Sequence, residues 1–189
     1  MTEKETVGLF EKHNALLSGH FKLSSGRHSG RYLQCALILQ YPEIAEKLAR
    51  DIAARFTGEK IDLVVGPALG GVTLAYEVAR AIGVRGIFTE RSDGAMVLRR
   101  GFSIAPGERV LVVEDVVTTG LSTKEVIDAV KAQGGVVAAV ASIIDRSDTL
   151  PDYGVSFEPL AKIKIETYKP EECPLCKAGS PAVKPGSRR

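Results

Sequence analysis

The most constraining feature of the sequence is the segment 110–123, Val-Leu-Val-Val-Glu-Asp-Val-Val-Thr-Thr-Gly-Leu-Ser-Thr. Four apolar residues lead into two adjacent carboxylates, and a Thr-Thr-Gly turn precedes a helical pattern over 122–133. The pattern predicts a buried strand, a loop and then a helix, whose N-terminal N–H groups and dipole suit a phosphate. The carboxylates Glu114 and Asp115 only accept hydrogen bonds, so sugar hydroxyls or a divalent metal are their natural ligands. The segment predicts a site for a phosphorylated sugar.

Composition and charge narrow the function further. The chain has 189 residues, 44% of them apolar and 25% charged, as in a globular protein with one core. A net charge of +2 gives no concentrated basic face for nucleic acid. No apolar run approaches the ~20 residues that span a bilayer, and residues 1–10 do not resemble a signal peptide. With only three cysteines, we expect a cytoplasmic protein without disulfides or membrane contact.

Apolar periodicity predicts helices that alternate with strands. We expect helices over 3–18, 42–56, 72–82 and 122–133, and strands over 61–66, 84–89, 110–113, 136–144 and 161–165. A hairpin-like segment is expected over 20–40, a long loop with some short strand over 91–107, and an irregular tail from Lys169. This alternation predicts βαβ units and a mostly parallel sheet.

Three strand ends carry unusual residues: 66–71 with its three glycines, 114–122, and Asp145-Arg146. Ligands of parallel sheets bind at the carboxyl ends of strands, near the point where the strand order reverses. We therefore expect these three segments to form one site.

The segment 110–123 resembles the phosphoribosyl diphosphate (PRPP) signature of the type I phosphoribosyltransferases. Four further stretches, 23–29, 65–68, 99–102 and 144–146, resemble the members of this family that act on orotate. The resemblance implies an α/β fold with a mostly parallel central sheet flanked by helices. It also implies one domain over 1–189, with an N-terminal helix and small hood (1–40), a core (41–168) and an irregular tail (169–189).

The resemblance implies a reaction: orotate and PRPP give orotidine 5′-monophosphate and diphosphate, a step of pyrimidine biosynthesis. Glu114 and Asp115 would hold the ribose hydroxyls and stabilise positive charge on the ribose. Thr118 and Arg146 would contact orotate. The remaining PRPP contacts are assigned to Gly70 of the diphosphate turn and to Val116, Val117, Thr118, Thr119, Gly120, Leu121 and Ser122 of the 5′-phosphate loop. Mg²⁺ would be carried by PRPP, without direct protein ligands.

The resemblance also implies a homodimer in which a loop of one subunit, here 91–101, closes over the site of its neighbour. Arg91, Arg99 and Arg100 would neutralise the diphosphate. The family loop carries lysines and a histidine, but this chain has neither between Glu90 and Arg109. The usual lysines are also missing from the diphosphate turn and from position 24, which is serine. Either the arginines replace these cations, or turnover is weak, or the chemistry differs.

Two more residues and a motif remain. His28 and Tyr32 could approach the base, although a single histidine is more often structural. Cys173-Pro174-Leu175-Cys176 supplies two thiols, whereas structural zinc takes four ligands and the one other cysteine is Cys35. A turn with two free thiols is the simpler interpretation. A zinc site shared across a dimer is the alternative.

Two other functions fit the same signature. The PRPP motif binds only the sugar and the phosphate, so the protein could act on a base other than orotate. A PRPP-binding regulator without catalysis would explain the missing loop cations, but the chain lacks the basic face that such a regulator needs.

Overall fold

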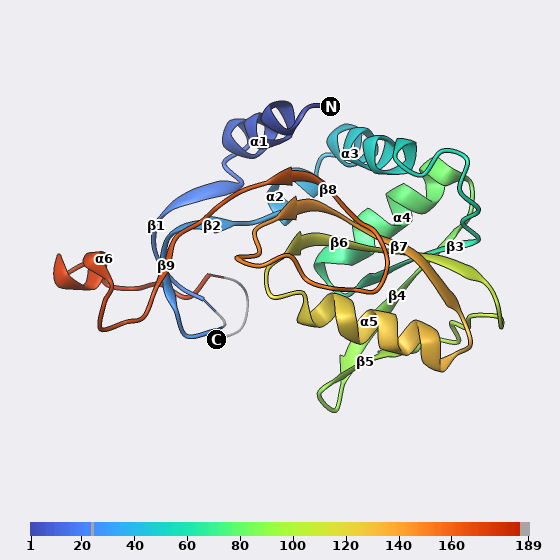
Figure 1. The fold of residues 1–189 in the computed structure, drawn as a ribbon. Helices are drawn as coiled ribbons and strands as arrows, with labels where there is room; N and C mark the ends of the chain where they lie inside the picture. The colour runs from blue at the N-terminus through green and yellow to red at the C-terminus, as the bar shows by residue number, and fades with distance from the viewer. Residues whose placement is uncertain (24, 186–189) are drawn as a thin grey trace.

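The computed structural model describes residues 1–23 and 25–185, and Figure 1 shows a central sheet with helices on both faces. The sheet has six strands in the order β5-β4-β3-β6-β7-β8, all parallel except β5, which pairs antiparallel with β4. The strands are β3 (Leu63–Pro67), β4 (Arg85–Ser92), β5 (Ala95–Leu98), β6 (Arg109–Val117), β7 (Val136–Asp145) and β8 (Phe157–Lys162).

Helices cover both faces because the strands are apolar on both sides. Along β6, Leu111 and Val113 pack in the core beneath α3 (Pro42–Ala54) and α4 (Gly70–Ile82), where α1 (Glu3–Lys12) also lies. Val110 and Val112 alternate with them and pack under α5 (Leu121–Ala132). α5 lies below the sheet in Figure 1, and α1 and α3 lie above it.

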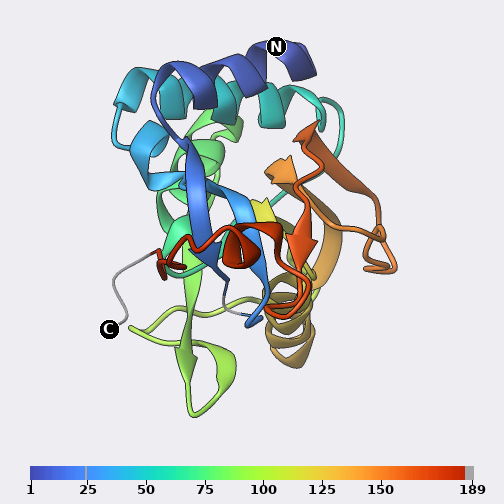
Figure 2. The same cartoon turned by 90° about the vertical axis from the view of Figure 1, so that its left-hand side faces the viewer.

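A second sheet stands at one end of the molecule (Figure 2). It has three antiparallel strands in the order β1 (Leu16–Lys22), β2 (His28–Leu33), β9 (Thr167–Tyr168). The short helix α2 (Ala36–Leu39) leads from it to the core, and α6 (Pro174–Lys177) lies against it. This small sheet joins residues near both ends of the chain.

Most predicted elements are confirmed, although several boundaries differ. The helix predicted over 3–18 ends at Lys12, because Asn14 adopts a left-handed φ of 52° and β1 begins at Leu16. The strand predicted over 161–165 is β8, four residues earlier in the chain. The short strand expected within the loop over 91–107 is present as β5, which forms a hairpin with β4; the turn of this hairpin, Asp93-Gly94, has φ values of 50° and 88°.

The tail predicted to be irregular contains the single-turn helix α6. Position 24, which we singled out as a serine in place of a lysine, lies outside the described residues.

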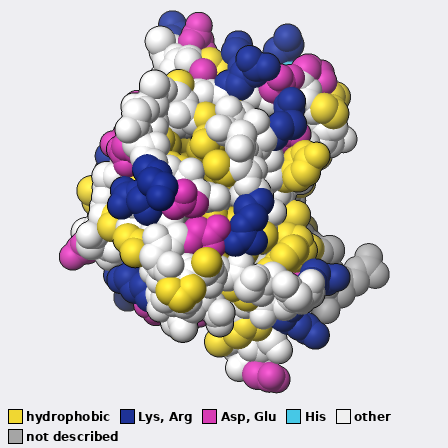
Figure 3. Space-filling model, turned by 90° about the vertical axis from the view of Figure 1, so that its right-hand side faces the viewer, with side chains coloured by type: hydrophobic (Ala, Val, Ile, Leu, Met, Phe, Trp, Pro, Cys, Tyr) yellow, Lys and Arg dark blue, Asp and Glu magenta, His cyan; other side chains and the backbone are white. Residues whose placement is uncertain are grey.

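No described helix combines the length and the apolar character needed to span a bilayer. On the face shown in Figure 3, acidic and basic side chains are interspersed, so this face carries no extended field of one sign.

Candidate active site

The strand order reverses between β3 and β6. β3 pairs with β4 on one side and with β6 on the other, and the helices that follow β3 and β6, α4 and α5, pack on opposite faces of the sheet. The N-termini of α4 and α5 therefore both open at the carboxyl edge of the sheet. This is the place where parallel sheets bind ligands, and the predicted convergence of 66–71, 114–122 and 145–146 is confirmed.

The two carboxylates end β6 in different surroundings. A Cβ atom on Gly70 would lie 2.5 Å from Oδ2 of Asp115, so only glycine lets the first turn of α4 approach this carboxylate. The backbone N–H of Val116 donates to Oδ1 of Asp115 over 2.9 Å. Glu114 alternates with Asp115 along the strand and is 8% exposed. Asp115 thus borders the N-terminus of α4, and Glu114 is turned toward the α5 face.

Burial raises the pKa of both carboxyl groups, and the neighbouring Asp115 raises the pKa of Glu114 further. Neither carboxylate forms an ion pair with a lysine or arginine of the described residues. Buried carboxylates without a cation are costly to keep charged. The pair is therefore suited to a ligand that brings hydroxyl donors, a metal ion or developing positive charge.

The loop after β6 is shaped by Gly120. Its φ is 75°, and a Cβ atom there would lie 2.7 Å from Oη of Tyr153 and 2.9 Å from Pro151. Gly120 occupies the N-cap position of α5 without a side-chain cap, and its carbonyl accepts the first helical bond, from Lys124 at 3.0 Å. Thr118 and Thr119 are exposed beside it. The loop therefore offers helix N–H groups and hydroxyls to an anion.

Two adjoining cavities open over this edge. The larger, of about 600 Å³, is bordered by the 118–119 loop, by Arg146 and by the small sheet, and the other, of about 560 Å³, by Leu69 and Gly70. Tyr32, Gln34 and Asp115 line both cavities. Asp115 therefore lies where the loops of β3 and β6 meet.

Two guanidinium groups line the larger cavity. Arg27 is held by Thr167, to whose Oγ1 and carbonyl oxygen it donates at 2.8 and 2.7 Å. Arg146 is half-buried, burial lowers its pKa, and it has no side-chain hydrogen bond or ion pair with the part of the chain that is described. A desolvated cation without an anion is suited to binding an anionic ligand.

Sequence reasoning did not assign a role to Arg27 or to Asp145. The backbone and Oγ of Ser147 donate to Oδ1 of Asp145 at 2.9 and 2.6 Å, which fixes the turn that presents Arg146. Arg27 lies in the stretch 23–29, which resembles family members that act on orotate, and this resemblance could have identified Arg27 as a candidate residue of the base pocket. Tyr32 was named as a candidate, and the structure places it beside Arg146 and Asp115, with a pKa raised by burial.

Several predicted residues lie away from these cavities. Arg91 pairs with Glu125 of α5, and Arg100 pairs with Glu90 at 2.7 Å and covers the ring of Phe88. Arg99 is exposed. These three arginines and Glu114 are not among the described residues that line the two cavities. His28 instead contacts His20 on the small sheet.

Comparison with known proteins adds to this geometry. Residues 37–167 match the family model described as phosphoribosyl transferase domain. The chain is 59% identical over 189 residues to the orotate phosphoribosyltransferase of Pelotomaculum thermopropionicum and 58% identical to that of Caldanaerobacter subterraneus subsp. tengcongensis, with full coverage of each chain.

Solved structures agree on the fold. The orotate phosphoribosyltransferase from Aeropyrum pernix aligns with a TM-score of 0.67 and 26% identity, over 82% of this chain and 92% of that one. The adenine phosphoribosyltransferase of Thermoanaerobacter pseudethanolicus aligns with a TM-score of 0.60 and 19% identity, over 70% and 88% of the two chains, so the fold alone does not select the base. The predicted fold class is confirmed. The chain belongs to the phosphoribosyltransferase family and, within it, to the orotate phosphoribosyltransferases.

Proposed function

We propose that this protein transfers the phosphoribosyl group of PRPP to orotate, which yields orotidine 5′-monophosphate and diphosphate. One observation carries the proposal: the Thr118-Thr119 loop that leads into α5, the carboxylate of Asp115 and the unpaired Arg146 all border the same opening at the strand reversal. A phosphate, a sugar and an anionic base are the three groups that these surroundings suit.

At the sugar end, the loop 116–122 binds the 5′-phosphate through backbone N–H groups, Thr118, Thr119 and Ser122. Glu114 and Asp115 accept hydrogen bonds from the ribose hydroxyls. As the bond to diphosphate breaks, positive charge develops on the ribose, and these carboxylates stabilise it in the transition state. The turn at Gly70 presents the first N–H groups of α4 to the diphosphate.

At the base end, Arg146 forms an ion pair with the orotate carboxylate, and Thr118 donates to the ring. Arg27 and Tyr32 complete the pocket from the small sheet. N1 of orotate supplies the electron pair for the new bond to C1′, the C1′–oxygen pair leaves with diphosphate, and the departing diphosphate takes up the N1 proton. The protein needs no covalent nucleophile, because positioning and charge stabilisation are sufficient. A guanidinium also favours orotate over a neutral base.

The residues at the second cavity fit a magnesium ion that arrives with PRPP. No lysine or arginine is among the described residues lining that cavity. Asp115 does line it, and its carboxylate oxygens could bind a hard cation such as Mg²⁺ through a bridging water molecule. Bound Mg²⁺ would offset the charge of the diphosphate leaving group. This chain's own contribution is to orient the diphosphate at the N-terminus of α4.

The second cavity has no lysine or arginine among its described lining residues to neutralise the diphosphate. This favours a homodimer in which Arg91, Arg99 and Arg100 reach a neighbouring subunit's diphosphate. Arg99, which is exposed at the end of the β4–β5 hairpin region, is the best placed for this role. A cytoplasmic location is the companion prediction, consistent with three free cysteines.

A direct assay tests the activity. Purified protein is mixed with PRPP, Mg²⁺ and orotate, and the loss of orotate absorbance is followed; uracil and hypoxanthine replace orotate as matched controls. Of the three bases, we expect only orotate to cause release of diphosphate from PRPP. Equal release with a neutral base would contradict the role of Arg146, and PRPP binding without any release would favour a regulator.

Subunit complementation tests the shared loop. Asp115→Asn and Arg99→Ala are each expected to have low activity. If the loop acts on the neighbour's site, mixing the two variants under subunit exchange restores activity, because one of the two sites in each heterodimer contains both native residues. A mixture no more active than its components would restrict Arg99 to its own subunit or remove its role.

A further inference from the structure

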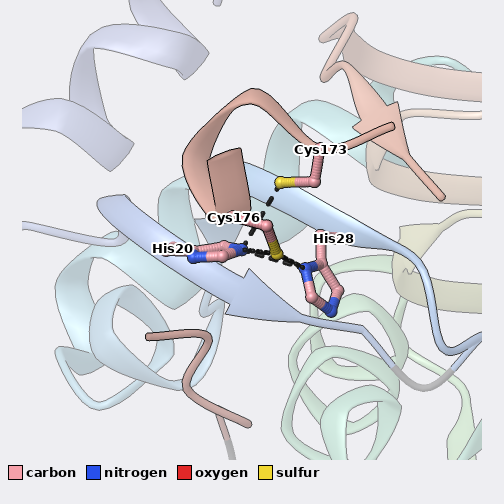
Figure 4. A group of neighbouring side chains, drawn as sticks. All are labelled: His20, His28, Cys173 and Cys176. Atoms are coloured by element: carbon pink, nitrogen blue, oxygen red, sulfur yellow. Dashed lines mark hydrogen bonds between the residues drawn. The ribbon is translucent and has the colours of Figure 1, made fainter. Parts of the chain in front are cut away.

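Two histidines and two cysteines meet on the small sheet (Figure 4), and none of the four is among the described residues that line the two cavities. His20 lies on β1 and His28 begins β2, while Cys173 is the N-cap residue of α6 and Cys176 lies within its single turn. The four ligand atoms lie within 4.8 Å of one another. We propose that these four side chains bind one structural Zn²⁺ ion that fastens the C-terminal segment to the small sheet.

The distances suit tetrahedral zinc. Sγ of Cys173 lies 3.5 Å from Nε2 of His20, and Sγ of Cys176 lies 3.7 Å from the same nitrogen and 3.3 Å from Nδ1 of His28. Zn–N bonds of about 2.0–2.1 Å and Zn–S bonds of about 2.3 Å place tetrahedral nitrogen and sulfur ligands about 3.5 Å apart. The two nitrogens are 2.9 Å apart, and an ion requires them to separate by a few tenths of an ångström.

The tautomer of His20 is fixed for this role. Its Nδ1–H donates to the carbonyl oxygen of Ser180 over 2.8 Å, and a carbonyl can only accept. The neutral ring therefore presents the lone pair of Nε2 to the cysteines. Such an outer hydrogen bond is the usual arrangement around a zinc-bound imidazole. Two thiolates and two neutral imidazoles make the set that selects zinc.

Within residues 169–185, few contacts other than these four side chains hold the C-terminal segment in place. α6 has four residues, none of them buried, and a helix of this length is not stable by itself. Cys173 is fully buried beside His20 and His28, which are 6% and 7% exposed. Further along, Val183 exchanges backbone hydrogen bonds with His20 and Lys22. The zinc ion would therefore fasten a segment that has only a few polar contacts with β1.

The spacing of Cys173 and Cys176 supplies two of the four ligands that structural zinc needs, and the one other cysteine, Cys35, does not complete the set. The spacing therefore favoured two free thiols. His20 and His28 come from the opposite end of the chain, 153 and 148 residues away from their cysteine partners. The complete ligand set lies within one subunit, so no dimer is required to assemble it.

Metal content of the full chain, purified under reducing conditions without added metal, tests the site. We expect about one zinc per chain, falling below about a tenth in Cys173→Ser, Cys176→Ser and His20→Asn. Cys35→Ala and His13→Asn are the matched controls, since neither residue belongs to the cluster, and both should keep the zinc.

A second measurement does not depend on the folding of a variant. After the unaltered chain is stripped by a chelator, Co²⁺ should give thiolate charge-transfer absorption and the intense visible bands of tetrahedral cobalt, and one equivalent of Zn²⁺ should abolish both. A chain that is zinc-free as purified and takes up neither ion would overturn the proposal, as would a Cys173–Cys176 disulfide. Iron in place of zinc would overturn the choice of metal. None of these results depends on the proposed transferase activity.

Discussion

The two ends of the cavity are built in different ways. The sugar-phosphate end comes from one strand, loop and helix, β6 to α5, and its proposed contacts lie within 114–122. The base end combines Arg27, Tyr32 and Arg146, and the first is fixed by Thr167, 140 residues further along the chain. A local segment fixes phosphate binding, whereas base recognition depends on how distant segments pack. The variants below test this difference.

The largest effect is expected for Asp115→Asn. The amide keeps the size of the side chain but removes the charge that stabilises the ribose in the transition state. We expect the turnover number to fall by about 10²–10³-fold, with a much smaller change in PRPP affinity. Steady-state kinetics and PRPP titration separate the two quantities. Unaltered turnover would remove the proposed role of Asp115.

Arg146→Ala tests the base end. Loss of a charge-assisted pair is expected to raise the KM for orotate by about 10–100-fold and to leave the KM for PRPP nearly unchanged. Arg50→Ala, which removes an exposed arginine paired with Glu46 on α3, is the control. An effect of equal size on both KM values would show that the two ends are not separable.

Gly120→Ala tests the phosphate loop. The methyl group meets Tyr153 and Pro151, and the φ of 75° disfavours any side chain. We expect a destabilisation of about 1–3 kcal/mol and a KM for PRPP raised about tenfold, measured by thermal unfolding and by kinetics. Gly8→Ala in α1 is the control, because a Cβ atom there meets nothing within 4 Å. If the two substitutions behave alike, the close approach at Gly120 is not required.

Glu114→Gln should give the smallest of these effects when it is measured on the unliganded chain, where the proposed role of Glu114 in catalysis does not enter and only stability changes. Burial and Asp115 raise the pKa of Glu114 above its ordinary value of 4.5, so the folded chain binds this proton more tightly than the unfolded chain. Stability therefore falls as the pH rises from that value through the raised pKa. The Glu114→Gln variant does not lose this stability, because the glutamine side chain does not ionise.

We expect the unliganded variant to match the parent in stability near pH 4 and to have a higher Tm than the parent at higher pH, because only the parent loses stability as Glu114 ionises. Unfolding curves across this pH range provide the measurement. A variant less stable than the parent at pH 8 would mean that the charged form of Glu114 has a favourable partner.

The sequence allowed the core and the sugar-phosphate end to be predicted, because both depend on local patterns. Apolar periodicity located α3, α4 and β7, and the segment 110–123 placed acids, loop and helix in order. The helix end at Lys12 and the hairpin turn at Asp93-Gly94 were missed, although Asn and Asp-Gly carry local signals for them.

The base end and the histidine–cysteine cluster could not be predicted in the same way. Arg27 acquires its role only when β2 pairs with β9, and His20 meets Cys176 only when α6 packs on the small sheet. Such contacts depend on tertiary packing between segments that share no local pattern. The roles of Arg91, Arg99 and Arg100 depend further on a second subunit and stay predictions.

The pairing of β2 with β9 has a consequence for synthesis. Chains emerge from the ribosome N-terminus first. The hairpin of β1 and β2 precedes the six-stranded sheet in the chain, whereas the third strand, β9, and the four residues of α6 follow all six of its strands. The six-stranded sheet can form on the nascent chain before β9 pairs with β2, so a product truncated before β9 would retain the phosphate loop and Arg146 but lack the partner that holds Arg27.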